Sequence, residues 1–234
     1  MAAAEPIAEL LAGMCSLGRD AVAAGLVVAS GGNLSARLPG ADTFWVTAAG
    51  TWLDRLTPAD FVEVRLDDGV AAGGASTEVA LHLATYRVRP DVNAVVHLHP
   101  QLAILLDSLG EPIRLITTDH AFYLRRIART PFHPPNTAGL AAAAAEAVAD
   151  GTNCVLLAHH GCSVLGPDLT MAHRRAVNLE EAARLTYRAS SRASTEPERL
   201  QAEHEELIGL ACAGRAADFE AALQRHIDAS HPGV

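Results

Sequence analysis

Apolar residues follow helical spacing in some parts of the chain and strand-like alternation in others, and these two kinds of segment interleave. The helical segments cover about 7–24, 76–88, 101–109, 137–150 and 169–189. The strand-like segments cover about 33–37, 43–47, 61–66, 92–97, 114–117, 127–131, 154–158 and 162–165. Interleaved helices and short strands predict an α/β layered fold, in which helices flank a central, mostly antiparallel or mixed sheet.

Capping, proline and glycine residues indicate a further helix start and a C-terminal segment. Thr57 followed by Pro58 is typical of a helix start, with Thr57 as the N-cap. A polar break at 190–197 precedes a helical pattern over 198–231, in which Gly214 falls near the expected turn. We therefore predict a main domain over 1–190 and a C-terminal helical hairpin within the tail 191–234.

Composition narrows the class of partner. The 234 residues carry 18 basic and 27 acidic side chains, a formal charge of −9, and no basic run, which disfavours nucleic acids and anionic membranes as partners. The N-terminal segment 1–28 lacks the basic start of a signal peptide, and no uncharged stretch approaches the ~20 residues of a membrane span. We expect a cytoplasmic protein that acts on a small molecule. Its scattered, unpaired cysteines fit reduced thiols there: Cys15, Cys154, Cys162 and Cys212.

Four residues have the chemistry of a catalytic metal site. His97 and His99 lie in V-V-H-L-H-P, His160 lies in L-L-A-H-H-G, and Glu78 lies in A-S-T-E-V. Two histidines two positions apart point to the same side of an extended strand, so the spacing of His97 and His99 indicates a strand end. Three imidazoles and a carboxylate are a ligand set that leaves room for substrate on a divalent ion. A metal-dependent enzyme is therefore predicted.

Five motifs resemble the class II aldolase/adducin family, especially its fuculose-phosphate aldolase branch. The resemblance runs from about residue 5 to 189, and its motifs keep the family's order and separations. They are S-G-G-N-L-S (30–35), V-T-A-A-G (46–50), A-S-T-E (75–78), R-P-D-V-N-A-V-V-H-L-H (89–99) and L-L-A-H-H-G (156–161).

The resemblance implies a divalent metal ion bound by His97, His99 and His160. Zinc is the usual ion in the family, with manganese or cobalt as other candidates. The resemblance further implies that Glu78 is a fourth metal ligand at rest and an acid/base once substrate displaces it from the ion. Alternatively, the Glu78 carboxylate could only cap the N-terminus of the helix that begins near residue 76. The implied reaction is reversible aldol cleavage of a small hydroxy-ketone or ketose 1-phosphate through an enediolate. Alternatives are a decarboxylase, epimerase or dehydratase on the same site, or a non-catalytic adducin-like binding module.

A second group of residues resembles the family's phosphate cradle. It combines Asn33 with the Gly50 backbone N–H and the hydroxyls of Ser76 and Thr77. Phosphate-using relatives carry a threonine where this chain has Ala49, and losing one such hydrogen bond to a charged group costs roughly 1.5–3 kcal/mol. A carboxylate or an uncharged polar tail is therefore an alternative to phosphate.

The segment 117–123 falls where relatives supply a second proton-transfer group. His120 and Tyr123 are the candidates, and packing at a subunit interface is the alternative. The resemblance also implies a homotetramer with four-fold cyclic symmetry, in which a neighbour's residues complete each active site.

The remaining histidines receive structural predictions. We expect His159 to support its neighbour, and His82 and His173 to pack or cover the surface. The tail is similar to the last two helices of the FCD domain of GntR-type regulators, where His204 and His226 would match metal ligands. Because the rest of that domain is missing, a packing or oligomer-stabilising hairpin is favoured over a second metal site.

Overall fold

The computed structural model describes residues 4–69 and 73–190 and parts of the tail, namely 205–210, 213–215, 217–219, 221–222 and 225. Within these residues a seven-stranded sheet has the order β3-β2-β1-β4-β7-β6-β5. Neighbouring strands are antiparallel except β5 and β6, which are parallel. The predicted α/β fold with a mostly antiparallel sheet is therefore confirmed.

The elements match most of the predicted segments to within a few residues. The strands are β1 (Asn33–Ala36), β2 (Thr43–Thr47), β3 (Phe61–Arg65), β4 (Ala94–Leu98), β5 (Ile127–Thr130), β6 (Cys154–Leu157) and β7 (Gly161–Gly166). The helices are α1 (Ala4–Ala23), α2 (Val79–Val88), α3 (Gln101–Leu109), α4 (Thr118–Leu124), α5 (Ala138–Val148) and α6 (Leu169–Ser190).

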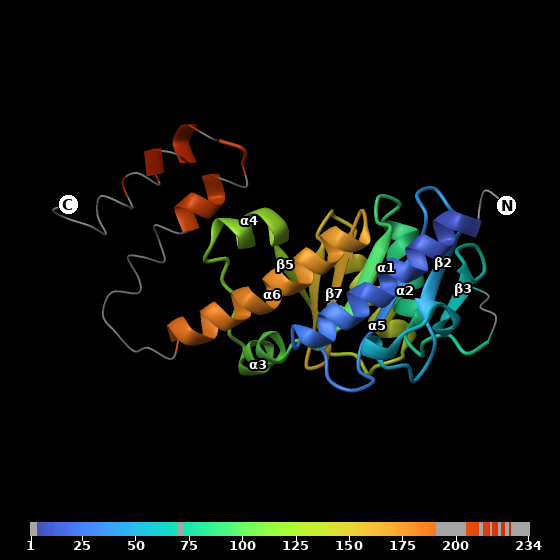
Figure 1. Cartoon of the computed structure of the whole chain (residues 1–234). Helices are drawn as coiled ribbons and strands as arrows, with labels where there is room; N and C mark the ends of the chain where they lie inside the picture. Colours follow the sequence, from blue (N-terminus) through green and yellow to red (C-terminus); the bar gives the residue numbers. More distant parts are fainter. Residues whose placement is uncertain are drawn as a thin grey trace.

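Helices cover both faces of the sheet (Figure 1). Helices α1, α3, α4 and α6 contribute to one apolar cluster, together with Leu34, Val96 and Leu98 from the sheet. Helices α2 and α5 contribute to a second cluster, together with Phe44 and Val95. Because side chains alternate along a strand, β1 and β4 supply both layers from neighbouring positions.

One local prediction was wrong, and a second was confirmed over a single turn only. Residues 111–116 form no strand, although Ile113 and Leu115 pack against the core, and the chain then forms the unpredicted helix α4. The expected helix start at Thr57 is a single 3₁₀ turn, Pro58–Asp60, with a capping box between Thr57 and Asp60. It ends because β3 begins at the next residue and pairs with β2.

The described parts of the tail agree with a turn at Gly214. Residues 205–210 are helical, Gly214 has a φ of 67°, and Arg225 donates to Glu206 at 3.0 Å. His204 and His226, the proposed second metal pair, lie outside the described residues.

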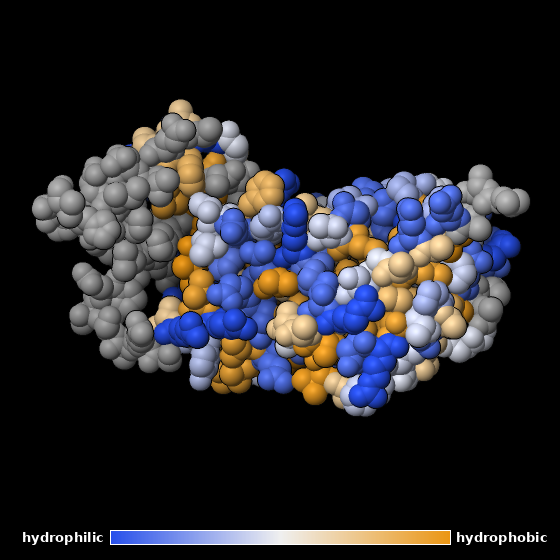
Figure 2. Space-filling model, in the orientation of Figure 1, coloured by the Kyte–Doolittle hydropathy of each residue, from blue (hydrophilic) through white to orange (hydrophobic). Residues whose placement is uncertain are grey.

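The surface in front of α1 and α6 mixes hydrophobic patches with hydrophilic ones (Figure 2). Exposed apolar side chains include Phe122 on α4, at 66% exposure, and Val177 on α6. Among the described helices, none is both long and apolar enough to cross a membrane.

Candidate metal centre

Strand β4 delivers two histidines to one point at the edge of the α2 layer. His97 is its fourth residue and His99 follows its end, and their Nε2 atoms lie 3.0 Å apart. His97 Nδ1 donates to the carbonyl oxygen of Cys162 on β7, at 2.9 Å. This bond fixes the ring and leaves the Nε2 lone pair directed into the cluster.

The turn between β6 and β7 brings the third histidine. The ligand atoms of His97, His99 and His160 all lie within 4.8 Å of one another. His159 has a φ of 56° and is not part of the cluster, and its backbone N–H donates to Asp107 Oδ2 at 2.9 Å. The second histidine of the pair, rather than the first, therefore faces the candidate metal position, and Asp107 supports the turn.

Glycines allow these segments to approach the histidines. A Cβ built on Gly161 would lie 2.5 Å from the Leu98 carbonyl oxygen and 2.6 Å from His99 Cδ2. A Cβ on Gly31 would lie 2.9 Å from His99 Nδ1. The G-G and H-H-G motifs are thus explained by close packing against the histidine rings.

Glu78 faces the histidines from the start of α2. Its Oε2 lies 3.0 Å from His97 Nε2, and its Oε1 lies 3.6 Å from His160 Nε2. Glu78 occupies the N-cap position of α2, but its side chain makes no capping hydrogen bond. The capping alternative therefore does not describe this carboxylate, which is directed to the cluster.

Burial and neighbouring charges set the protonation of this site. Burial alone would raise the pKa of Glu78, but its close contacts with His97 and Asn33 and the nearby His160 outweigh burial and hold that pKa well below its usual range. Burial, together with the nearby His97 and His160, lowers the pKa of His99 to about 4. The site thus favours a carboxylate at Glu78 and a neutral imidazole at His99, the forms that bind metal ions.

The donor set fits a divalent ion. Glu78 Oε1 and His160 Nδ1 are buried without a hydrogen-bond partner among the described residues. Nitrogens that each lie about 2.0–2.1 Å from one ion are roughly 3 Å apart, which agrees with the 3.0 Å between the His97 and His99 nitrogens.

A pocket of about 200 Å³ opens beside Glu78, His99 and His160. Apart from these three residues, no residue that lines it carries an ionisable side chain. Its other lining residues are Ser30, Gly31, Gly32, Asn33, Ala48, Ala49, Gly50, Thr51, Ser76, Thr77, Pro135 and Asn136. All four predicted substrate-binding residues therefore line one pocket, but two of them also have local partners. Asn33 Nδ2 donates to Glu78 at 2.9 Å, and Ser76 Oγ accepts from the Glu78 backbone N–H at 3.2 Å.

His82 is part of this site, which the sequence did not indicate. It is fully buried on α2, and its Nε2 is hydrogen-bonded to Asn33 Oδ1. The available signal was its position four residues after Glu78, which places both on one side of the chain as it enters a helix.

The sequence of residues 12–187 matches the Class II Aldolase and Adducin N-terminal domain. This chain belongs to the class II aldolase and adducin family. The L-fuculose phosphate aldolase of Methanocaldococcus jannaschii is 34% identical over 160 residues, which cover 68% of this chain and 86% of that protein. The 3-oxo-tetronate 4-phosphate decarboxylase of Escherichia coli is 34% identical over 169 residues, covering 70% of this chain and 79% of that protein.

Solved structures agree with this membership of the class II aldolase family. The L-fuculose-1-phosphate aldolase of Thermus thermophilus aligns with a TM-score of 0.70 and 32% identity, covering 80% of this chain and 97% of that one. The predicted family and the prediction of a metal-dependent aldolase type of enzyme are thus confirmed. Decarboxylases among the relatives keep that alternative within the family.

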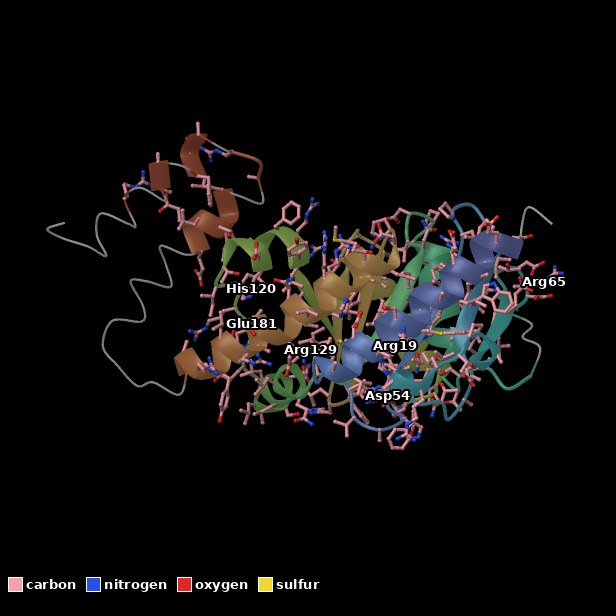
Figure 3. The ribbon with its side chains drawn as sticks, in the orientation of Figure 1. Arg19, Asp54, Arg65, His120, Arg129 and Glu181 are labelled. Atoms are coloured by element: carbon pink, nitrogen blue, oxygen red, sulfur yellow. The ribbon has the colours of Figure 1, made fainter. Side chains whose placement is uncertain are left out.

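The two candidates for a second proton-transfer group lie elsewhere in this class II aldolase fold. His120 is buried on α4 and lies beside Glu181 of α6 (Figure 3). Tyr123 is on the same helix, and its backbone carbonyl accepts from Arg175 at 3.1 Å. Neither residue lines the pocket or joins the histidine cluster in the described part of the chain. Neither residue therefore contributes to the pocket of its own chain.

Proposed function

We propose that this chain is a divalent-metal-dependent lyase that cleaves a small hydroxy-ketone, in the first instance a ketose 1-phosphate, by a reversible aldol reaction. The observation that carries the proposal is the carboxylate of Glu78. It lies against the histidine cluster and also lines a pocket with Gly50, Ser76 and Thr77. A proton-transfer group and a candidate anion cradle thus share one pocket.

His97, His99 and His160 would hold the ion, with Glu78 as a fourth ligand at rest. When bound, a divalent ion supplies a Lewis acid for the negative charge that develops on the ketone oxygen. We propose zinc, since the three nitrogens and one carboxylate form a set that it accepts, with manganese or cobalt as substitutes.

Glu78 would move the proton at carbon. In the condensation direction its carboxylate takes a proton from the carbon that becomes the nucleophile, and in cleavage the same oxygen returns it. A second group must exchange a proton with the hydroxyl that becomes the aldehyde, and we propose His120 or Tyr123 of a neighbouring subunit for it.

Neutral donors would bind the anionic end of the substrate. Among the described residues, no lysine or arginine lines the pocket. The proposed donors are therefore the Gly50 N–H, the hydroxyls of Ser76 and Thr77 and the second hydrogen of the Asn33 amide. Ala49 offers no hydroxyl there, which weakens the case for phosphate relative to a carboxylate or a neutral polar tail.

The direct test measures dihydroxyacetone phosphate released from a panel of ketose 1-phosphates by zinc-, manganese- and cobalt-loaded protein. We expect release that chelator abolishes and metal restores. His97→Ala serves as the inactive control and His173→Ala as the matched active one. If fully metal-loaded protein released no dihydroxyacetone phosphate from any member of the panel, the phospho-ketose aldolase proposal would be contradicted.

A decarboxylase is the second candidate, supported by the decarboxylase relatives and by the altered cradle at Ala49. It is tested by measuring carbon dioxide released from 3-oxo-tetronate 4-phosphate by the same metal-loaded preparations. Release from this acid without cleavage of any ketose 1-phosphate would favour the decarboxylase.

We further propose a homotetramer with shared active sites and a cytoplasmic location. The exposed Phe122 beside Tyr123 on α4 supports a subunit contact at this helix, and the buried free thiols of Cys15, Cys154 and Cys162 support a reducing compartment. We propose the tail over 191–234 as a separate hairpin that stabilises the oligomer.

Subunit mixing tests the shared sites. When His160→Ala and His120→Ala protomers are mixed, about a quarter of the interfaces in random tetramers should pair two intact halves. Recovery of activity is expected from the mixture, while each variant alone stays inactive. Verified mixed oligomers without recovery would contradict shared sites.

A further inference from the structure

A buried chain of hydrogen bonds leads from the interior of the α2 layer to Glu78. Tyr86 OH lies 2.9 Å from Ser35 Oγ, and Ser35 Oγ lies 2.6 Å from His82 Nδ1. His82 Nε2 is bonded to Asn33 Oδ1, and Asn33 Nδ2 donates to Glu78 Oε2 at 2.9 Å. His82 and Ser35 are at 0% exposure, so water does not compete for these bonds.

The carboxylate fixes the direction of every bond in this chain. Glu78 accepts only, so Asn33 must present its NH₂ group to Glu78 and its oxygen to His82. His82 therefore donates from Nε2, and its Nδ1 must accept from the Ser35 hydroxyl. Ser35 then accepts from Tyr86. Full burial lowers the pKa of His82 to about 3, in agreement with one neutral tautomer.

Among the described residues, only Glu78 and His82 form hydrogen bonds with the Asn33 side-chain amide. Turned by 180°, it would place an oxygen against the Glu78 oxygen and an NH₂ group against the His82 donor. Since Asn33 Oδ1 can accept and Nδ2 cannot, the N–H of His82 holds the amide from its other end, in the same orientation that the Glu78 carboxylate requires.

We propose that His82 is a positioning residue for the catalytic carboxylate: its Nε2–H holds the Asn33 amide so that Asn33 supports Glu78 beside the metal-binding histidines. This inference rests on the proposed function in that Glu78 is taken as the metal ligand and proton-transfer group. It differs from simple packing because it depends on one donor atom rather than on the volume of the ring.

A matched pair of substitutions separates the donor from the packing. In His82→Gln the side-chain amide nitrogen falls near the position of Nε2 and can still donate to Asn33. In His82→Asn the amide ends near the position of Nδ1, so it keeps the Ser35 partner and loses the Asn33 bond. Asn33→Ala breaks the same link from its other end.

The first readout is the affinity of the full-length apoprotein for Co²⁺, followed by the visible absorption of the bound ion, and it needs no substrate. We expect His82→Asn to weaken the Co²⁺ affinity about 10-fold or more and to shift the band, because outer partners of ligands typically change metal affinity or activity 10–100-fold. His82→Gln should stay within about three-fold of wild type. If the wild-type enzyme converts a substrate of the panel, kcat for that substrate should fall in His82→Asn while KM changes little.

A double-mutant cycle provides the second readout and remains decisive if His82→Asn does not fold. The combination of His82→Ala with Asn33→Ala should bind Co²⁺ no more weakly than Asn33→Ala alone, because both substitutions break the same link. Asn33→Ala at wild-type affinity, or equal losses in His82→Gln and His82→Asn, would overturn the proposal. Wild-type protein that binds no Co²⁺ would overturn the metal site itself, whereas an unreactive substrate panel leaves the Co²⁺ results to decide the role of His82.

Discussion

The two faces of β1 and β4 differ sharply although they come from neighbouring residues. On one face Leu34 and Val96 are fully buried in an apolar cluster with α1 and α6. On the other face Asn33 and His97 are register partners and belong to the hydrogen-bonded site beneath α2. One pair of strands thus supplies the core and the chemistry by strict alternation.

The difference between the two faces separates the residues that stabilise this fold from those that carry its chemistry. The apolar face gains free energy from burial, while the polar face holds the histidine cluster and its hydrogen-bonded partners Asn33 and Glu78. Substitutions on the first face should change the free energy of unfolding, and substitutions on the second should chiefly change metal binding and activity.

The largest expected effect is on the polar face, where His97→Ala removes a central nitrogen of the cluster. We expect loss of tight metal binding and a fall in turnover of about a thousandfold or more, since the Lewis acid contributes several kcal/mol to the transition state. Metal content after dialysis and turnover measure the two effects.

His173→Ala on α6 is the matched control, because His173 lies outside the cluster. It should retain metal and activity. Equal metal retention by His97→Ala and His173→Ala would contradict the assignment of the cluster as the metal site.

The next effect in size belongs to the apolar face. Leu34→Ala should lower the free energy of unfolding by about 2–5 kcal/mol, because Leu34 is completely buried and its removal leaves a cavity. Urea unfolding measures the loss. The folded fraction should still bind the metal at near wild-type stoichiometry, and a Leu34→Ala protein that is stable but metal-free would break the separation of the two faces.

The same alternation explains how much the sequence could predict. His97, His99, His160 and Glu78 stood out because their residue types and spacing are unusual. The alternating 114–117 segment was misassigned for the opposite reason. Its partly buried Ile113 and Leu115 contact the core without a neighbouring strand, which a local pattern cannot reveal.

The hydrogen bond between Asn33 and His82 could not be predicted from the sequence. The two residues are 49 positions apart, and the role of each depends on which end of one amide faces which neighbour. Asn33 was predicted to bind substrate, yet its amide also supports Glu78. His120 and Tyr123 remain predictions, because their proposed partner is another subunit.

A glycine at the junction of the two faces sharpens the comparison. Gly161→Ala would force a methyl group against the Leu98 carbonyl and the His99 ring, with an expected cost of about 1–3 kcal/mol from overpacking. Metal affinity should fall together with stability, unlike in Leu34→Ala. Gly73→Ala is the control, since a Cβ there meets no atom within 4 Å, and equal behaviour of the two variants would contradict the close approach.

The smallest expected effect concerns pH and the buried His82. The pKa of His82 is about 3 in the folded protein and near 6.5 in the unfolded chain. Below pH 6.5, His82 is therefore protonated in the unfolded chain but remains neutral in the folded protein. Stability from this residue is therefore complete above pH 6.5 and declines as the pH falls toward 3. Between pH 6 and pH 5 the free energy of unfolding should fall by about 1 kcal/mol because of His82.

Urea unfolding of metal-free protein at both pH values measures this fall. The free energy of unfolding of His82→Gln, which has no titrating ring, should fall by about 1 kcal/mol less than that of wild type. Parallel declines in the two proteins would mean that His82 is already protonated in the folded state, and the polar face would then not be held by a neutral donor.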